Sequence, residues 1–290
     1  MRFFKGHGLG NDYLALDIAA LGFTLAPPAI RLLCDRHHGI GADGVLARVA
    51  TEAADFGVRI FNPDGSEAEK SGNGLRIFAA YLRAEGALDG RTVFTVETVG
   101  GVVGMRILEE STEGVLLVEV EMGHASFRSG AVGLSGPDRE VDGEILELPS
   151  GETVGITAVS VGNPHCVVFR DDLDPEDLRR RAPQIATHPW YERGTNVQFA
   201  RALAPNAVAA WVWERGAGET LASGSSACAV AAAAVRRGLV STRQVEVHMP
   251  GGILEVEVRD DWSILLRGPV EGVYRGELTQ GMLRRLEVLT

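Results

Sequence analysis

Two segments of small residues could bind an anion through backbone N–H groups. The first, Ser71-Gly72-Asn73-Gly74, precedes an apolar segment that predicts a helix from Leu75 to about Glu85. The first N–H groups of a helix lack partners within the helix, and the helix dipole favours negative charge there. We therefore expect a carboxylate or phosphate group to bind at this turn.

The same pattern recurs 152 residues later, at the start of a second predicted helix from Ser225 to Arg237. An apolar strand pattern precedes both turns, at 58–62 and 210–214. The repeat predicts two related halves, each with a Ser-Gly turn at a helix start. Residues that match at this offset are Glu67 and Glu219, Ser71 and Ser223, Gly72 and Gly224, and Gly86 and Gly238.

Asparagines recur as well. Gly10-Asn11 and Gly162-Asn163 occupy equivalent positions in two turns, and the second continues with Pro164 and His165. An asparagine in a turn can serve the backbone conformation alone. Its presence at both equivalent positions favours a role in binding.

Composition limits the class of protein. The 290 residues suit two domains, and 45% hydrophobic with 23% charged residues is typical of a globular protein. The net charge of −11 disfavours nucleic-acid and anionic-membrane partners, and no apolar run reaches the roughly 18 residues of a membrane span. We expect no signal peptide, and three scattered cysteines predict a reducing, cytoplasmic location without a disulfide scaffold.

Two further motifs could indicate known kinds of site, a metal site and a dinucleotide-binding site, but neither has the required spacing. His37 and His38 have no carboxylate or cysteine at ligand spacing, so we expect no metal site. The glycines at 39, 41 and 44 are spaced too loosely for a dinucleotide fingerprint.

The expected fold is α+β, with two pseudosymmetric domains at 1–122 and 123–271 and a tail at 272–290 that packs on the first. Each domain is expected to be a curled, mainly antiparallel sheet around a central helix. The alanine-rich segment 227–234 is small on every face, which is typical of a helix buried among strands. We expect the two helix N-termini to face each other across a cleft.

Other elements are predicted along the chain. Residues 123–152 show little periodicity and are expected to form the crossing between the halves, and a glycine-rich link is expected between strands at 262–267 and 276–278. Short helices are expected at 25–34 and 171–181, and strands at 2–5, 13–16, 91–108, 115–121 and 245–258.

Several blocks resemble the diaminopimelate epimerase family, in order and over nearly the whole chain. These blocks are Phe4–Asp12, Gly39–Asp43, Phe61–Glu67, Gly162–His165, Thr195-Asn196 and Glu214–Thr220.

The resemblance implies an isomerase without cofactor or metal. Such an enzyme converts LL- to meso-diaminopimelate by α-proton transfer, in the synthesis of lysine and peptidoglycan precursors. It also implies a homodimer and a small amino-acid ligand. By motif, Asn11, Asn62, Asn163 and Asn196 would contact polar groups of the substrate. Gly72, Asn73, Gly224 and Ser225 would donate N–H groups to its α-carboxylate. Glu214 and Arg215 would meet its distal end or support the catalytic pair, with His165 close by.

The chain departs from the family at the catalytic pair. The resemblance implies a cysteine in each domain, as thiolate base and thiol acid, at positions 71 and 223, and serine occupies both. A helix N-terminus can convert a thiol to thiolate, whereas a serine hydroxyl is a far weaker acid and needs a helper. His165 and Glu214 are the candidates, and Cys34, Cys166 and Cys228 are expected to be core thiols.

Three interpretations follow for the two serines. The chain is an engineered Cys-to-Ser pair that holds substrate without turnover, a natural homologue with altered chemistry, or an amino-acid-binding protein without catalysis. Altered chemistry includes slow epimerisation and a dehydratase or lyase reaction in which one serine donates a proton. The remaining pocket blocks match under each interpretation, and we place the amino-acid isomerase first.

Overall fold

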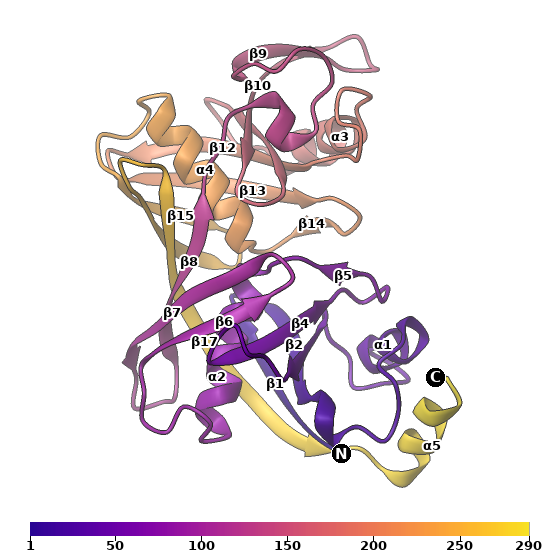
Figure 1. The fold of residues 1–290 in the computed structure, drawn as a ribbon. Coiled ribbons are helices and arrows are strands. Elements are labelled where there is room, and N and C mark those ends of the chain that lie inside the picture. Colours follow the sequence, from indigo (N-terminus) through magenta and orange to yellow (C-terminus); the bar gives the residue numbers. More distant parts are fainter. Residues whose placement is uncertain (290) are drawn as a thin grey trace. The chain divides into compact units, whose positions relative to one another are not determined.

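A computed structural model describes residues 1–289, which form two compact units (Figure 1). Unit 1 comprises Met1–Val120 and the chain from Gly268 onward, and unit 2 comprises Glu121–Arg267. Within residues 1–289, no helix is both long enough and apolar enough to cross a membrane.

Unit 1 contains a mixed, mainly antiparallel sheet and a central helix, α2 (Gly72–Ala84). This helix contacts the strands β1 and β2 of the sheet. The pairs β2–β3 and β4–β6 are parallel, whereas β1–β2, β3–β4, β6–β7 and β7–β8 are antiparallel. The strands are β1 (Arg2–Gly8), β2 (Asn11–Asp17), β3 (Val45–Val49), β4 (Phe56–Phe61), β5 (Glu67–Ala68), β6 (Val93–Thr98), β7 (Gly101–Glu110) and β8 (Leu116–His124). The other helices are η1 (Ile18–Ala20), α1 (Pro27–Cys34) and α5 (Gln280–Val288).

Unit 2 repeats this pattern around α4 (Gly224–Arg236). The pairs β11–β12 and β13–β15 are parallel, whereas β10–β11, β12–β13 and β15–β16 are antiparallel. The strands are β9 (Asp142–Glu147), β10 (Thr153–Ser160), β11 (Pro164–Phe169), β12 (Asn196–Ala204), β13 (Ala207–Glu214), β14 (Gly218–Thr220), β15 (Gln244–Met249) and β16 (Gly252–Val258). The helices η2 (Ser129–Val132) and α3 (Pro175–Ala186) complete it. The long strand β17 (Ser263–Glu277) begins in unit 2 and belongs to unit 1 from Gly268 onward, where it pairs with β1.

The internal repeat is confirmed residue by residue. Adding 152 to the bounds of α2 gives those of α4, and adding 151 to those of β6 gives those of β15. Left-handed backbone recurs too, at Gly10 and Gly162 before the asparagines and at Gly86 and Gly238 after the helices. The predicted α+β class with two pseudosymmetric halves is therefore confirmed.

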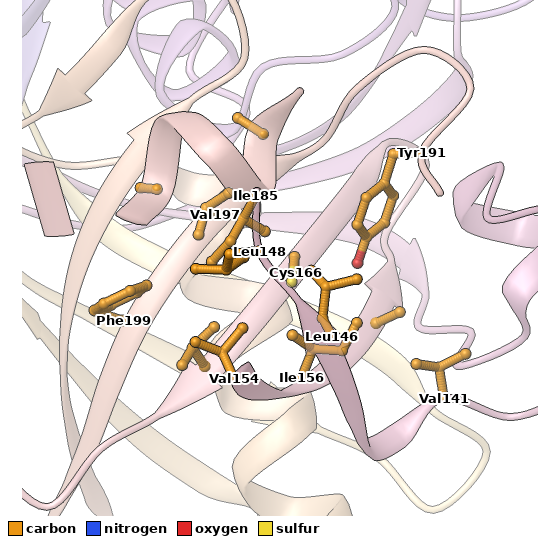
Figure 2. Close-up of a cluster of buried hydrophobic side chains, with 14 of the residues drawn as sticks. Val141, Leu146, Leu148, Val154, Ile156, Cys166, Ile185, Tyr191, Val197 and Phe199 are labelled. Carbon is orange, nitrogen blue, oxygen red and sulfur yellow. The ribbon is translucent and has the colours of Figure 1, made fainter. Parts of the chain in front are cut away.

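Helix α4 lies among strands, as its composition predicts. Residues 226–234 are all buried, and the helix contacts β10, β11, β12, β13, β15 and β16. Small side chains allow strands to approach on every side. A second part of the unit 2 core is the cluster in Figure 2, which includes Cys166 together with Leu146, Val154, Ile156 and Phe199.

The segment 123–152, which shows little periodicity in the sequence, contains η2 and the strand β9, which pairs with β10. One prediction about a connection is wrong. The link expected between 267 and 276 is part of the continuous strand β17. Its glycines fit a strand because rings from β1 cover them: a Cβ at Gly272 would lie 3.0 Å from Phe4, and one at Gly276 would lie 2.6 Å from Phe3.

Candidate functional site

Ser71 and Ser223 are the N-cap residues of α2 and α4. Their backbones are nearly identical, with φ/ψ of −138°/118° and −143°/126°. The Ser71 Oγ accepts a hydrogen bond from the Gly74 N–H at 3.0 Å, whereas the Ser223 side chain makes no capping bond. The Ser71 hydroxyl therefore accepts a capping hydrogen bond within its helix, and the Ser223 hydroxyl does not.

In unit 1, Asn73 lies in the first turn of α2 and reaches Asn11 at the start of β2. The Asn73 Nδ2 donates to Asn11 Oδ1 at 3.2 Å, and Asn11 Nδ2 donates to Asp43 Oδ2 at 3.1 Å. The Arg76 guanidinium is fully buried behind them and donates to Asn73 Oδ1 at 2.7 Å. The predicted residues Asn11 and Asn73 are thus hydrogen-bonded directly to each other, and each also contacts a residue that the sequence interpretation missed, Asp43 and Arg76 respectively.

A charged cluster fixes the turn that carries Asn11. Asp12 forms ion pairs of 2.8 Å with both Lys5 and Arg36, and Arg36 also contacts Asp43 at 2.7 Å. Burial raises the pKa of Asp12, but hydrogen bonds from Arg36 and Lys5 outweigh it and lower that pKa to about 2. Both carboxylates accept backbone N–H groups as well, Asp12 from Asp43 and Asp43 from Asp12.

Gly39 approaches the backbone of α1 closely, so a larger residue at 39 is expected to destabilise the fold. A Cβ at Gly39 would lie 1.8 Å from the backbone oxygen of Leu32. We expect Gly39→Ala to lower the free energy of unfolding by at least about 2 kcal/mol, measured by urea denaturation. Gly22→Ala is the matched control, because a Cβ there meets nothing within 4 Å. Equal stability of both variants would contradict this.

Asn62 follows β4 and belongs to a tight turn. Its backbone N–H donates to Ser66 O at 2.8 Å, and its Nδ2 donates to Ser66 Oγ at 2.9 Å. Asn62 is half-buried. These hydrogen bonds of Asn62 lie within its own turn, and its role in binding stays a prediction.

In unit 2, Asn196 joins two of the predicted turns. Its Oδ1 accepts from the Arg215 N–H at 2.9 Å, and its Nδ2 donates to Pro164 O at 3.1 Å. Parallel pairing of β11 with β12 places Asn196 beside His165. Asn163, Asn196, Glu214 and Arg215 therefore come from three neighbouring strand ends. Arg215 is exposed and donates to Arg193 O at 2.9 Å.

His165 is fully buried with both ring nitrogens in use. Nδ1 lies 3.0 Å from Gln198 Nε2, which can only donate, so Nε2 carries the proton and donates to Asn163 Oδ1 at 2.9 Å. Burial lowers the pKa of His165 to about 3, so the ring is neutral. This arrangement orients Asn163.

Gln198 is a further residue that sequence interpretation missed. Its Nε2 also donates to Ser226 Oγ at 2.9 Å, so it joins His165 to the first turn of α4. The equivalent pair in unit 1 is apolar: Leu46 matches Gln198, and Gly74 matches Ser226. A Cβ at Gly74 would lie 3.0 Å from the Leu46 side chain. Comparing the two halves at the fixed offset could have identified this coupled exchange.

Tyr13 occupies in unit 1 the place of His165 in unit 2. Its hydroxyl lies 3.5 Å from Ser71 Oγ. The repeat thus places a titratable ring at equivalent positions of both halves, a correspondence that the sequence interpretation also missed.

All three cysteines are buried, which confirms the prediction of core thiols. Burial raises the pKa of Cys34 and of Cys166 to about 12. Cys166 lies in the apolar cluster of Figure 2, where the Tyr191 hydroxyl points toward it. Neither thiol is a ready source of thiolate.

Each unit therefore presents a helix N-terminus with an oriented asparagine. Gly72 and Asn73 begin α2, and Gly224 and Ser225 begin α4, so their N–H groups belong to the unpaired first turns. These groups can bind carboxylate oxygens and stabilise negative charge on a carboxylate as it develops. Metal-type groupings of three or more His, Cys, Asp or Glu are absent from the described part of the chain.

Known proteins match this chain over nearly its full length. Diaminopimelate epimerase 2 of Nostoc sp. (strain PCC 7120) is 44% identical over 280 residues, 96% of each chain. Diaminopimelate epimerase of Pelotomaculum thermopropionicum is 42% identical over 279 residues, 96% of this chain and 98% of the relative.

Solved structures share the fold. A hydroxyproline epimerase from Agrobacterium vitis with bound trans-4-hydroxy-L-proline gives a TM-score of 0.73 at 15% identity, over 96% of this chain and 90% of that one. A phenazine biosynthesis protein of the PhzF family from Bacillus anthracis gives 0.68 at 17% identity, over 96% and 99%. The family model described as diaminopimelate epimerase matches residues 3–128 and 157–273. With its epimerase relatives at these identities, the chain belongs to the diaminopimelate epimerase family, a family of isomerases.

Proposed function

We propose that this protein is an amino-acid isomerase that interconverts LL- and meso-diaminopimelate by moving the α-proton. The observation that carries the proposal is the pair of equivalent helix N-termini, each with serine at the N-cap position, where the family resemblance implies a cysteine. Membership of an epimerase family supports the substrate class. In the cell this reaction would serve lysine and peptidoglycan precursor synthesis in the cytoplasm.

In this proposal the α-carboxylate binds N–H groups of Gly72 and Asn73 and those of Gly224 and Ser225. Neutralising that carboxylate makes the α-proton more acidic, so no cofactor is needed. Asn11, Asn62, Asn163 and Asn196 contact the other polar groups of the substrate. Glu214 and Arg215 meet its distal end or support the catalytic pair.

Proton transfer would then fall to Ser71 and Ser223, which are weak acids and weak bases. A serine needs a neighbouring base to act. Both ring nitrogens of His165 are engaged by Gln198 and Asn163, which supports orientation of Asn163 over direct proton transfer. We therefore expect slow turnover compared with a two-cysteine enzyme, since each acid–base group contributes about 10²–10⁴-fold.

Exchange of the α-proton with solvent tests the proposal. Incubation with LL- or meso-diaminopimelate in D₂O is expected to replace the α-proton with deuterium, followed by ¹H NMR. The Ser71→Ala/Ser223→Ala double variant is the control and is expected to remove the exchange. Absence of exchange at high protein concentration would refute the isomerase proposal and leave an amino-acid-binding protein or a lyase.

The unequal serines favour a second candidate, a lyase or dehydratase. Ser71 Oγ is held by the Gly74 N–H, whereas Ser223 Oγ makes no hydrogen bond within residues 1–289. A single available hydroxyl suits one proton donation better than a two-way transfer. Release of an unsaturated or oxo acid, instead of deuterium exchange, would identify this reaction.

The proposed assembly is a homodimer, supported by the family resemblance. Light scattering coupled to size-exclusion chromatography would give twice the chain mass of 30.9 kDa. A mass of one chain would refute it.

A further inference from the structure

A directed chain of hydrogen bonds runs from a buried cation to a carboxylate in unit 1. Arg76 donates to Asn73 at 2.7 Å, Asn73 donates to Asn11 at 3.2 Å, and Asn11 donates to Asp43 at 3.1 Å. We call these four residues the amide relay. All lie in unit 1, and Arg76 and Asn73 are buried.

The chemistry of the two ends fixes the direction. A guanidinium has donors and no acceptor, and a carboxylate has acceptors and no donor. The oxygen of Asn73 must therefore face Arg76, which turns its amide nitrogen toward Asn11. The oxygen of Asn11 then faces Asn73, and its nitrogen faces Asp43. Both ends impose the same orientation on both amides.

The orientation decides which group Asn11 can recognise. Its nitrogen uses one proton on Asp43, and its second proton has no acceptor among residues 1–289. Asn11 thus offers an N–H donor, which suits a carboxylate oxygen. With the amide reversed it would offer an oxygen, which suits an ammonium group. We propose that Arg76 and Asp43 are positioning residues that make Asn11 a donor to a carboxylate of the ligand.

Helix stability does not account for Arg76. A cation in the first turns of a helix opposes the helix dipole, and a buried charge is costly to desolvate. At the equivalent position, α4 has the buried residue Cys228 and is a helix of the same 13 residues. The fold of the helix therefore does not require an arginine at this point.

In unit 2, other residues likewise engage the side-chain oxygen of the equivalent asparagine. Asn163 matches Asn11, and its oxygen accepts from His165, which accepts in turn from Gln198. In both units the asparagine oxygen is used within the protein. Different partners thus engage the asparagine oxygen in each unit. This recurrence supports a functional need for the asparagine nitrogen as a hydrogen-bond donor.

The proposal rests on the proposed amino-acid ligand, and its test separates the two. Arg76→Met removes the donor at similar length, and Arg76→Lys restores a cationic donor. Arg83→Met on the same helix is the matched control, since Arg83 pairs with the exposed Glu110. Asn73→Asp is an isosteric variant that still accepts from Arg76 but cannot donate to Asn11 when ionised, and it keeps the test open if Arg76→Met does not fold.

The first measurement uses the ligand-free protein. The side-chain amide signals of Asn11 in ¹⁵N NMR, assigned with Asn11→Ala, are expected to show slow hydrogen exchange in the wild type. Exchange at this amide is expected to become at least 10-fold faster in Arg76→Met and Asn73→Asp and to stay unchanged in Arg83→Met. Unchanged exchange in both relay variants would overturn the proposal, whatever the ligand is.

The second measurement is the Kd for meso-diaminopimelate by calorimetry. A charge-assisted hydrogen bond contributes about 1.5–3 kcal/mol, so Arg76→Met is expected to weaken binding by about 10- to 100-fold. Arg76→Lys is expected to recover part of the loss, and Arg83→Met to bind as the wild type does. Wild-type Kd in Arg76→Met would overturn the positioning role. No binding by the wild type would instead refute the proposed function, and the exchange result would still decide whether the relay exists.

Discussion

Cysteine at both positions 71 and 223 is expected to raise the rate of α-proton exchange in diaminopimelate by at least about 10³-fold. Both residues are N-caps of 13-residue helices, where the helix N-terminus lowers a thiol pKa toward neutrality. A thiolate base and a thiol acid would replace two hydroxyl groups, and each acid–base group contributes about 10²–10⁴-fold. Deuterium incorporation and interconversion of the LL and meso isomers measure the rate.

The single variants Ser71→Cys and Ser223→Cys serve as controls. Each restores one of the pair and leaves the other step to a hydroxyl, so each is expected to gain far less than the double variant. The same substitutions should leave the fold intact, because the Cys side chain is close in size to Ser. A folded double variant that binds diaminopimelate without faster exchange would show that the substrate or the reaction is assigned wrongly.

Acid is expected to destabilise the folded protein through His165 before its carboxylates titrate. The folded-state pKa of His165 is lowered to about 3, from 6.5 for an ordinary histidine. Below pH 6.5 His165 binds a proton in the unfolded chain but not in the folded chain. The free energy of unfolding is therefore highest above pH 6.5 and falls as the pH drops toward 3. At 1.36 kcal/mol per unit, the loss between pH 7 and 4.5 is about 3 kcal/mol.

Urea denaturation at several pH values measures this loss. His165→Gln is expected to be less stable at pH 7, because it disturbs the bonds to Gln198 and Asn163, but to lose much less stability between pH 7 and 4.5. His37→Gln is the matched control at an exposed position and is expected to keep the wild-type dependence. Asp12 affects the stability of the fold only at lower pH, because its pKa is lowered to about 2. The same pH dependence in His165→Gln and the wild type would rule out His165 as the cause.

The sequence predicted the elements whose pattern is local. The two central helices follow from the Ser-Gly turns and apolar segments, and the start of α4 differs from the predicted one by a single residue. The burial of α4 follows from alanine at successive positions, because no face of the helix carries bulk that would prevent packing.

The structure of the connections was harder to predict from the sequence, because it depends on partners that are distant in the chain. β9 forms by pairing with β10, and the glycines of β17 are covered by Phe3 and Phe4 from the other end of the chain. Glycine and proline indicate a loop when read locally. A partner strand or ring supplies the stability that such a segment lacks by itself.

The sequence alone determined the repeat, the family resemblance and the serines at positions 71 and 223, because each depends on residue types at a fixed spacing. Only the tertiary structure decided which polar atoms meet. Arg76, Asp43 and Gln198 look like ordinary helix, turn and strand residues in the sequence, and folding brings them to Asn73, Asn11 and His165. The same folding gives Ser71 a bond to Gly74 that Ser223 lacks, although the two serines have nearly the same backbone. Whether two polar atoms form a hydrogen bond depends on a few tenths of an ångström between side chains, and no local pattern in the sequence encodes that distance.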